Sequence, residues 1–265
     1  MQMEDWNGRA ISVARSRGGV LATVNPSDNL VRSGTSPWPP PEILQKFYQS
    51  RQGTAFDGAD AAEHFGYYCD LQSLNSEDAI TWSFFGPLVY ANSQTRYCYL
   101  SELCRLIDIP APDPGNIYVW LWRRIPHPEN PFSLHSPEID FGFQASNLLI
   151  FGEAKWRSGV NKKQGIAGDK DQMMLRRAFC NRYGAKLFPE CQRFVVLGLS
   201  IAGDVIKPFE DTCGTTRIQG CNTTWERLAS IGSHPFAEEI KRYYSWKPKP
   251  LLAAVAITNA MKAET

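Results

Sequence analysis

The stretch IDFGFQASNLLIFGEAKW, residues 139–156, carries charged side chains within and beside an apolar run. Asp140 lies near its start, and Glu153 and Lys155 lie two residues apart near its end. A buried charge is costly unless it is paired or bound to a metal. Neighbouring carboxylates are hard oxygen ligands that suit Mg²⁺, and a lysine beside them can orient a water or steady a charged transition state. These residue types are suited to the hydrolysis of a phosphodiester bond.

Two strands are expected to position these side chains. PEIDFGFQ (137–144) and NLLIFGEAKW (147–156) are rich in β-branched and aromatic residues, and a short turn separates them. Side chains alternate between the two faces of a strand, so Glu153 and Lys155 point the same way. An antiparallel hairpin can then place Asp140 beside Glu153.

The Glu-x-Lys spacing alone is weak evidence, because common residues produce it by chance. The chain contains a second example, Glu239-Ile240-Lys241, within PFAEEIKRYY. That segment has the apolar periodicity of an amphipathic helix, and no aspartate-bearing strand precedes it closely. We interpret it as the solvated face of a helix. The pair at 153 and 155 instead ends an apolar strand and follows an aspartate by thirteen residues.

The remaining elements suggest a mixed α/β protein. Residues 1–36 look irregular. Ser76 is a predicted N-cap, and Gly86-Pro87 is predicted to end the helix that follows it. The other predicted elements are helices at about 41–50, 59–72, 94–107, 169–183, 223–231 and 235–245, and strands at 117–124 and 193–201. This order predicts a sheet with helices on both faces.

The pattern PEID, twelve residues and then EAK resembles the PD-(D/E)XK nuclease superfamily, which has the restriction-endonuclease-like fold. The resemblance covers about residues 61–201 and is strongest at 137–155. The order of helix, three-strand meander, helix and strand is also similar. The resemblance implies an α/β core with a mixed central sheet between helices. We expect one such domain at 41–265, after an irregular segment at 1–40.

The resemblance also implies roles for individual residues. Asp140 and Glu153 would bind Mg²⁺, for which Mn²⁺ can substitute, and the backbone carbonyl of Ala154 would be a further ligand. Lys155 would be the catalytic lysine. The segment reads Pro-Glu-Ile-Asp instead of Pro-Asp, so Glu138 is an alternative to Asp140 on the same strand face. Asp140 is favoured because it lies deeper in the strand.

Two helices are implied to complete the site. Glu77, in SEDAITWSFFG, would be a further metal ligand; Glu63 is its rival, and stabilisation of a helix start is the structural alternative. Gln172, on the helix after the lysine strand, would be a polar catalytic residue. An ordinary surface glutamine is the alternative for that position.

The charge distribution is uneven although the net charge is only +1. Residues 1–154 hold 10 Lys and Arg against 17 Asp and Glu, whereas residues 155–193 hold 10 against 3. Such a basic block can contact a phosphate backbone, and a solvated helix face is the alternative. The candidate phosphate contacts, which would position nucleic acid without reading its sequence, are Lys162, Lys163, Arg176 and Arg177.

Other kinds of site find less support. The 7 cysteines form no CxxC pair, and the 4 histidines have no HxH or HxxxH spacing. GLSIAG (198–203) approximates the GxSxG motif of serine hydrolases, but Ala202 breaks the match. The N-terminus lacks the apolar core of a signal peptide, and LLAAVAI (251–257) is too short to cross a bilayer. We therefore expect a cytoplasmic protein with no membrane partner.

The sequence thus predicts a Mg²⁺-dependent nuclease that acts on nucleic acid, with DNA favoured over RNA and internal cleavage favoured over digestion from an end. Restriction, defence and repair are the expected settings, and a homodimer or a larger complex is the expected assembly. The alternative is a catalytically inactive subunit of the same fold that binds DNA or supports assembly. The intact set of Asp140, Glu153 and Lys155 favours catalysis.

Overall fold

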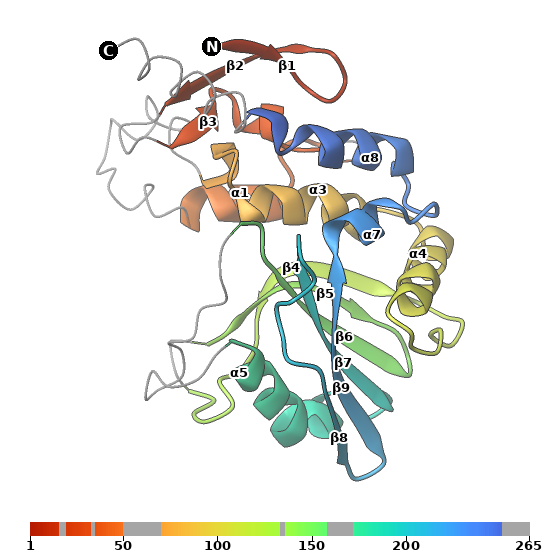
Figure 1. Cartoon of the computed structure of the whole chain (residues 1–265). Helices are drawn as coiled ribbons and strands as arrows, with labels where there is room; N and C mark the ends of the chain where they lie inside the picture. The colour runs from red at the N-terminus through yellow and green to blue at the C-terminus, as the bar shows by residue number, and fades with distance from the viewer. Residues whose placement is uncertain (16–19, 33–34, 50–69, 133–135, 158–171, 251–265) are drawn as a thin grey trace. The chain divides into compact units, whose positions relative to one another are not determined.

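The computed structural model describes residues 1–15, 20–32, 35–49, 70–132, 136–157 and 172–250. The chain divides into two compact units, Met1–Phe84 with Phe236–Thr265, and Phe85–Pro235. It is a mixed α/β protein with a six-stranded mixed sheet and a small antiparallel sheet (Figure 1). The predicted α/β class is therefore confirmed, and the single nuclease-like domain expected over 41–265 stays a prediction.

The six-stranded sheet belongs to the second unit. Its strands are β4 (Tyr118–Arg124), β5 (Glu138–Gln144), β6 (Leu148–Ala154), β7 (Arg193–Ser200), β8 (Phe209–Cys213) and β9 (Thr216–Thr224). They lie in the order β4-β5-β6-β7-β9-β8, with β6, β7 and β9 parallel and the other pairs antiparallel. The predicted strands β4 to β7 are confirmed, and the hairpin of β8 and β9 was not predicted.

Helices cover both faces of this sheet. They are α4 (Ser93–Leu106), α5 (Gln172–Phe179), α6 (Ala185–Leu187) and α7 (Trp225–Ala229), with a π-helical turn at Cys180–Gly184. Phe143 pairs with Ile150 across the β5–β6 ladder, so Phe151 points to the opposite face. Tyr99 of α4 stacks on Phe143, whereas Phe179 of α5 packs against Phe151. The two helices therefore lie on opposite faces (Figure 1).

Helix α3 (Glu77–Val89) begins as predicted but ends later. The Ser76 hydroxyl oxygen accepts a hydrogen bond from the amide of Ala79, which confirms the N-cap. The helix does not end at Gly86-Pro87 but continues to Val89 with Pro87 in its last turn. Leu88 is fully buried there, so packing outweighs the hydrogen bond that proline removes.

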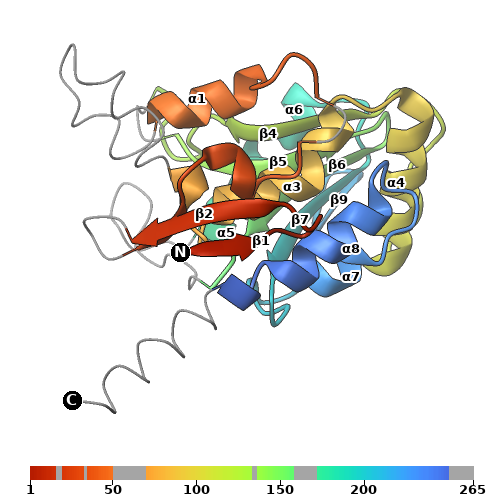
Figure 2. The same cartoon turned by 90° about the horizontal axis from the view of Figure 1, so that it is seen from above.

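The first unit contains more regular structure at the N-terminus than expected. Residues 1–40 include a three-stranded antiparallel sheet of β1 (Gln2–Glu4), β2 (Ala10–Arg15) and β3 (Leu21–Thr23). The other described elements of this unit are η1 (Pro26–Asn29), α1 (Pro41–Gln49), η3 (Asp70–Gln72), the part of α3 up to Phe84, and α8 (Ala237–Trp246). The Trp246 indole donates a hydrogen bond to the Glu4 carbonyl, and Figure 2 shows α8 beside β1. Such long-range contacts order a segment whose local sequence signals a loop.

The sequence predicts neither a membrane-spanning segment nor a disulfide framework. No helix in the described part of the chain is both long enough and apolar enough to span a bilayer. The six described cysteines are free thiols, and burial raises the pKa of Cys104 and Cys180 to about 12. These two residues therefore behave as core side chains and not as reactive thiols.

Candidate active site

The hairpin of β5 and β6 brings Asp140 and Glu153 together. Phe141 pairs with Gly152 in the antiparallel ladder, and one residue further along Asp140 lies opposite Glu153. The ladder ends at that point. Beyond it, the Asp140 side chain connects the two strands, because its Oδ2 accepts a hydrogen bond of 2.8 Å from the backbone amide of Ala154. The predicted neighbourhood of the two carboxylates therefore agrees with the structure.

The strand pairing on the other side of Asp140 is interrupted as well. In the β4–β5 ladder, Leu121 pairs with Phe141 and Arg123 with Ile139, and the pair between them is missing. Trp122 lies in that gap with a φ of 50°, in the left-handed region that bulky side chains rarely adopt. Departures of this kind gather at functional sites, where the surrounding structure holds the strain. Asp140 thus sits at a break in both of its ladders.

Glu153 is a completely buried carboxylate with two cationic neighbours. Lys155 Nζ lies 2.8 Å from its Oε1, and the Arg176 guanidinium contacts its Oε2. These contacts are ion pairs, and neither carboxylate oxygen has a hydrogen-bond partner among the described residues. Because Glu153 is 0% exposed, its negative charge depends on these two cations.

Lys155 is positioned by its backbone. Its amide donates to the carbonyl of Leu199 on β7 at 2.7 Å, and its carbonyl accepts from the buried indole of Trp225 at 2.9 Å. Only 10% of the lysine side chain is exposed. The ammonium is thus fixed beside Glu153 on the same strand face, as the alternation of the strand predicts.

Arg176 is the main difference from the expected site. It was a candidate phosphate contact on the protein surface, but its side chain is only 1% exposed. Its guanidinium contacts Glu153 and also donates to the backbone carbonyls of Gln172 and Glu138, at 2.8 and 2.6 Å. A helical pattern in the sequence was the available signal, because Arg176 lies three residues after Met173 and three before Phe179, both buried.

The other candidates in the second unit are spread around this cluster. Glu138 lies 3.5 Å from Arg124, whereas Asp140 contacts the strand of Glu153, so the geometry supports Asp140 over Glu138. Gln172 begins α5, and its side-chain oxygen is buried without a hydrogen-bond partner in the described structure. An unsatisfied buried acceptor is costly, which distinguishes Gln172 from an ordinary surface glutamine.

Arg177, next to Arg176, has the opposite environment. Its side chain is 45% exposed and forms two hydrogen bonds to Asp211 on β8, of 2.5 and 2.6 Å. These bonds hold the pKa of the Asp211 carboxyl below its usual value. Arg177 remains accessible for the predicted phosphate contact, although a carboxylate already neutralises it.

Four candidates cannot be placed against the cluster. Lys162 and Lys163 lie outside the described residues, as does Glu63. Glu77 forms the first turn of α3 and belongs to the first unit, whereas Asp140 and Glu153 belong to the second. The proposed third carboxylate therefore stays a prediction. Within the described ranges, no group of three or more His, Cys, Asp or Glu side chains is arranged to hold a metal ion.

The residues that could hold a divalent cation are the carboxylates of Asp140 and Glu153 with the carbonyl of Ala154. Two carboxylates beside each other fit Mg²⁺, which commonly takes one or two of them and fills its other positions with water and phosphate oxygens. Both Glu153 oxygens already contact a cation. A metal on Glu153 would therefore replace Lys155 or Arg176 at one oxygen.

No protein-family model, curated protein or solved structure matched this chain in the comparisons.

Proposed function

We propose that this protein is a metal-dependent phosphodiesterase that cuts nucleic acid. Its active-site residues would be Asp140, Glu153 and Lys155. One observation carries the proposal: the β5–β6 hairpin puts the two carboxylates on adjacent strands, with the Lys155 ammonium 2.8 Å from Glu153. The basic block that follows Lys155 in the sequence supports an anionic substrate. The resemblance to PD-(D/E)XK nucleases, including the restriction-endonuclease-like core, belongs to this proposal.

In this proposal the metal, Asp140 and Lys155 each have a distinct role. A bound Mg²⁺ would lower the pKa of a water and neutralise charge on the phosphate. Asp140 would be held for ligation by the Ala154 amide, which fixes its carboxylate against β6. Lys155 would orient the attacking water or stabilise the charge that develops in the transition state.

Arg176 would act as a positioning residue. Its bonds to the Glu138 and Gln172 carbonyls do not depend on Glu153, so they can keep the guanidinium in place when a metal takes one oxygen of that carboxylate. Glu153 would then keep the Arg176 guanidinium beside it whether or not a metal is bound. This arrangement stabilises a deeply buried carboxylate both with the metal and without it.

The second candidate is a binding or assembly subunit without catalysis. The pairing of both Glu153 oxygens with side-chain cations favours it, because a site neutralised in this way does not need a metal. The cluster would then be a structural ion network. The two candidates differ in whether the protein cuts nucleic acid when a divalent metal is added.

Replacing Lys155 separates these candidates. Purified protein is incubated with linear, circular and single-stranded DNA and with RNA, in Mg²⁺, Mn²⁺ or EDTA. We expect metal-dependent cleavage that Lys155→Ala lowers by about a hundredfold or more, because the variant keeps both carboxylates but loses the positioned ammonium. The matched control is Lys241→Ala on α8, whose partner is the exposed Glu238. Wild-type protein that cuts nothing, or Lys155→Ala that cuts normally, would refute the proposal.

A further inference from the structure

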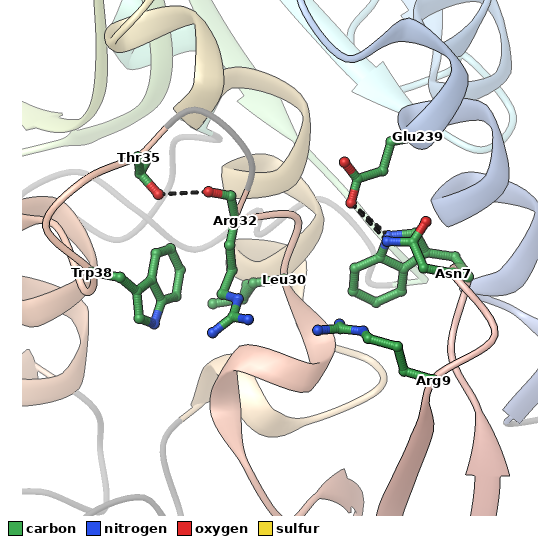
Figure 3. Close-up of a pocket in the computed structure, with 8 residues that line it drawn as sticks. Asn7, Arg9, Leu30, Arg32, Thr35, Trp38 and Glu239 are labelled. Carbon is green, nitrogen blue, oxygen red and sulfur yellow. Dashed lines mark hydrogen bonds between the residues drawn. The ribbon is translucent and has the colours of Figure 1, made fainter.

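The first unit contains a second cluster of side chains with the means to bind a ligand. It lines a cavity of about 390 Å³ whose walls include two arginines, two tryptophans and a glutamate (Figure 3). This volume lies within the range of small-molecule pockets. The residues used below are Trp6, Asn7, Arg9, Arg32, Trp38 and Glu239.

Two positive charges converge on this cavity. In Figure 3 the guanidinium groups of Arg9 and Arg32 point into the same space from different walls. Arg9 is held from behind by the buried Asp5, at 2.6 Å. Arg32 is exposed and forms no ion pair with any residue in the described ranges. Like charges repel, so an anion between the two groups would lower the energy of this arrangement.

The nearby acidic side chains balance these charges only in part. Burial raises the pKa of the Asp28 carboxyl, and the charges of Arg9 and Arg32 oppose that rise. Asp28 is therefore close enough to sense both guanidinium groups. It is not among the residues that line the cavity, so the two arginines still present their donors to a ligand.

Each guanidinium lies beside an indole ring. Arg9 is 5.9 Å from the ring centre of Trp6, and Arg32 is 5.7 Å from that of Trp38. Trp38 in turn meets Trp82 edge to face at 6.2 Å. These contacts restrict the arginine side chains before a ligand arrives. The indoles also give the cavity apolar walls on which a nucleobase can stack.

The carboxylate makes the cavity asymmetric. Glu239 Oε1 accepts hydrogen bonds from the Trp6 indole at 3.0 Å and from the side-chain amide of Asn7 at 3.1 Å. A ligand that is negative over its whole surface would be repelled at this wall. A ligand with an anionic end for the arginines and a neutral polar end for Asn7 and Glu239 matches both walls.

We propose that this cavity binds a nucleotide, with its phosphate between Arg9 and Arg32. Guanidinium groups suit phosphate because their donors match its oxygens in pairs. The nucleotide can be free or can be the phosphorylated end of a strand; only the strand-end form rests on the proposed nuclease function. Neither form requires the cluster at Glu153.

Binding measured in EDTA tests this site without cleavage. The probes are AMP, adenosine, and a short single-stranded DNA with and without a 5′-phosphate. We expect wild-type protein to bind AMP at least about tenfold more tightly than adenosine, because a charge-assisted hydrogen bond is lost with the phosphate. Tighter binding of the phosphorylated DNA than of AMP identifies a strand end as the ligand, and the reverse order identifies a free nucleotide.

Arg32→Gln is the informative variant, since its exposed side chain forms no ion pair with a described residue that the change would break. It should unfold at the wild-type temperature and bind AMP or phosphorylated DNA roughly 10- to 100-fold more weakly. Lys241→Gln removes one exposed charge from α8 of the same unit and should bind like wild type. The site is refuted if no probe binds, or if Arg32→Gln binds as tightly as wild type. If the nucleotide site is refuted but wild-type protein cuts nucleic acid, the proposed nuclease function still stands. If wild-type protein binds AMP through Arg32 but cuts no nucleic acid, only the nuclease function is refuted.

Discussion

At the scale of single residues, the charge on Glu153 decides how the candidate site can work. Its carboxylate is 0% exposed and lies between Lys155 and Arg176. Removing one partner from a buried ion pair leaves a charge without compensation, which costs far more than the net stabilisation the pair provides. The two neighbouring arginines on α5 allow this effect to be measured against an internal reference.

We predict that Arg176→Met lowers the free energy of unfolding by about 3–5 kcal/mol, because Glu153 then keeps only Lys155 as a partner. Chemical denaturation measures the change. Added Mg²⁺ should stabilise this variant more than it stabilises wild type, since a metal at Glu153 would replace the missing positive charge.

Arg177→Met is the matched control for this prediction. It removes the same kind of side chain one position along, from an exposed pair with Asp211. The variant should lower the free energy of unfolding by no more than about 1 kcal/mol, because exposed ion pairs stabilise a protein little. Equal losses in the two variants would show that Arg176 does not compensate a buried charge, and an absent Mg²⁺ effect would count against a metal at Glu153.

Residue types and strand alternation suffice to predict that Asp140, Glu153 and Lys155 lie together. The spacing of thirteen residues across a hairpin brings the aspartate opposite the glutamate, and alternation puts Lys155 on the same face. The burial of Arg176 was harder to predict. It depends on how α5 is rotated against the sheet, which the local sequence does not specify.

At the scale of elements, the strands with the strongest local signals were predicted and those that depend on distant contacts were missed. β6 and β7 are continuous apolar runs, which is typical of buried strands. β8 and β9 are only partly apolar, and their hairpin turns at Gly214 with a φ of 62°. That glycine between alternating residues was the available signal.

The close approach of β5 and β6 leads to a prediction about Gly152, the residue before Glu153. A Cβ at Gly152 would lie 2.1 Å from the ring of Phe141. That ring stacks on Phe85 at 3.9 Å and has little room to move. We predict that Gly152→Ala destabilises the fold by about 1–3 kcal/mol and displaces the carboxylates, with loss of any cleavage.

Thermal unfolding and the nuclease assay measure these two effects. Gly232→Ala is the control, because a Cβ there meets no atom within 4 Å. It should leave both stability and cleavage close to wild type. A stable and fully active Gly152→Ala protein would show that the hairpin can shift without disturbing Asp140 and Glu153.

At the scale of the whole molecule, charge is distributed unevenly along a nearly neutral chain. The net charge is +1, yet residues 155–193 carry 10 Lys and Arg against 3 Asp and Glu. The structure shows two different uses of this block, since Arg176 is buried at Glu153 and Arg177 is exposed at Asp211. Composition alone therefore overstates the number of charges available to a phosphate backbone.

Lys162 and Lys163, within this block, provide the last prediction. If they contact phosphates, Lys162→Ala with Lys163→Ala should weaken binding to all nucleic-acid sequences alike and flatten the salt dependence. The slope of log K against log salt should fall by roughly one unit per lost contact, because each contact releases about one condensed counterion. The control removes two exposed lysines elsewhere, Lys207 and Lys249, for the same change in net charge. If the two double variants have equal slopes, net charge drives binding; if only the first slope falls, the basic block contacts the backbone.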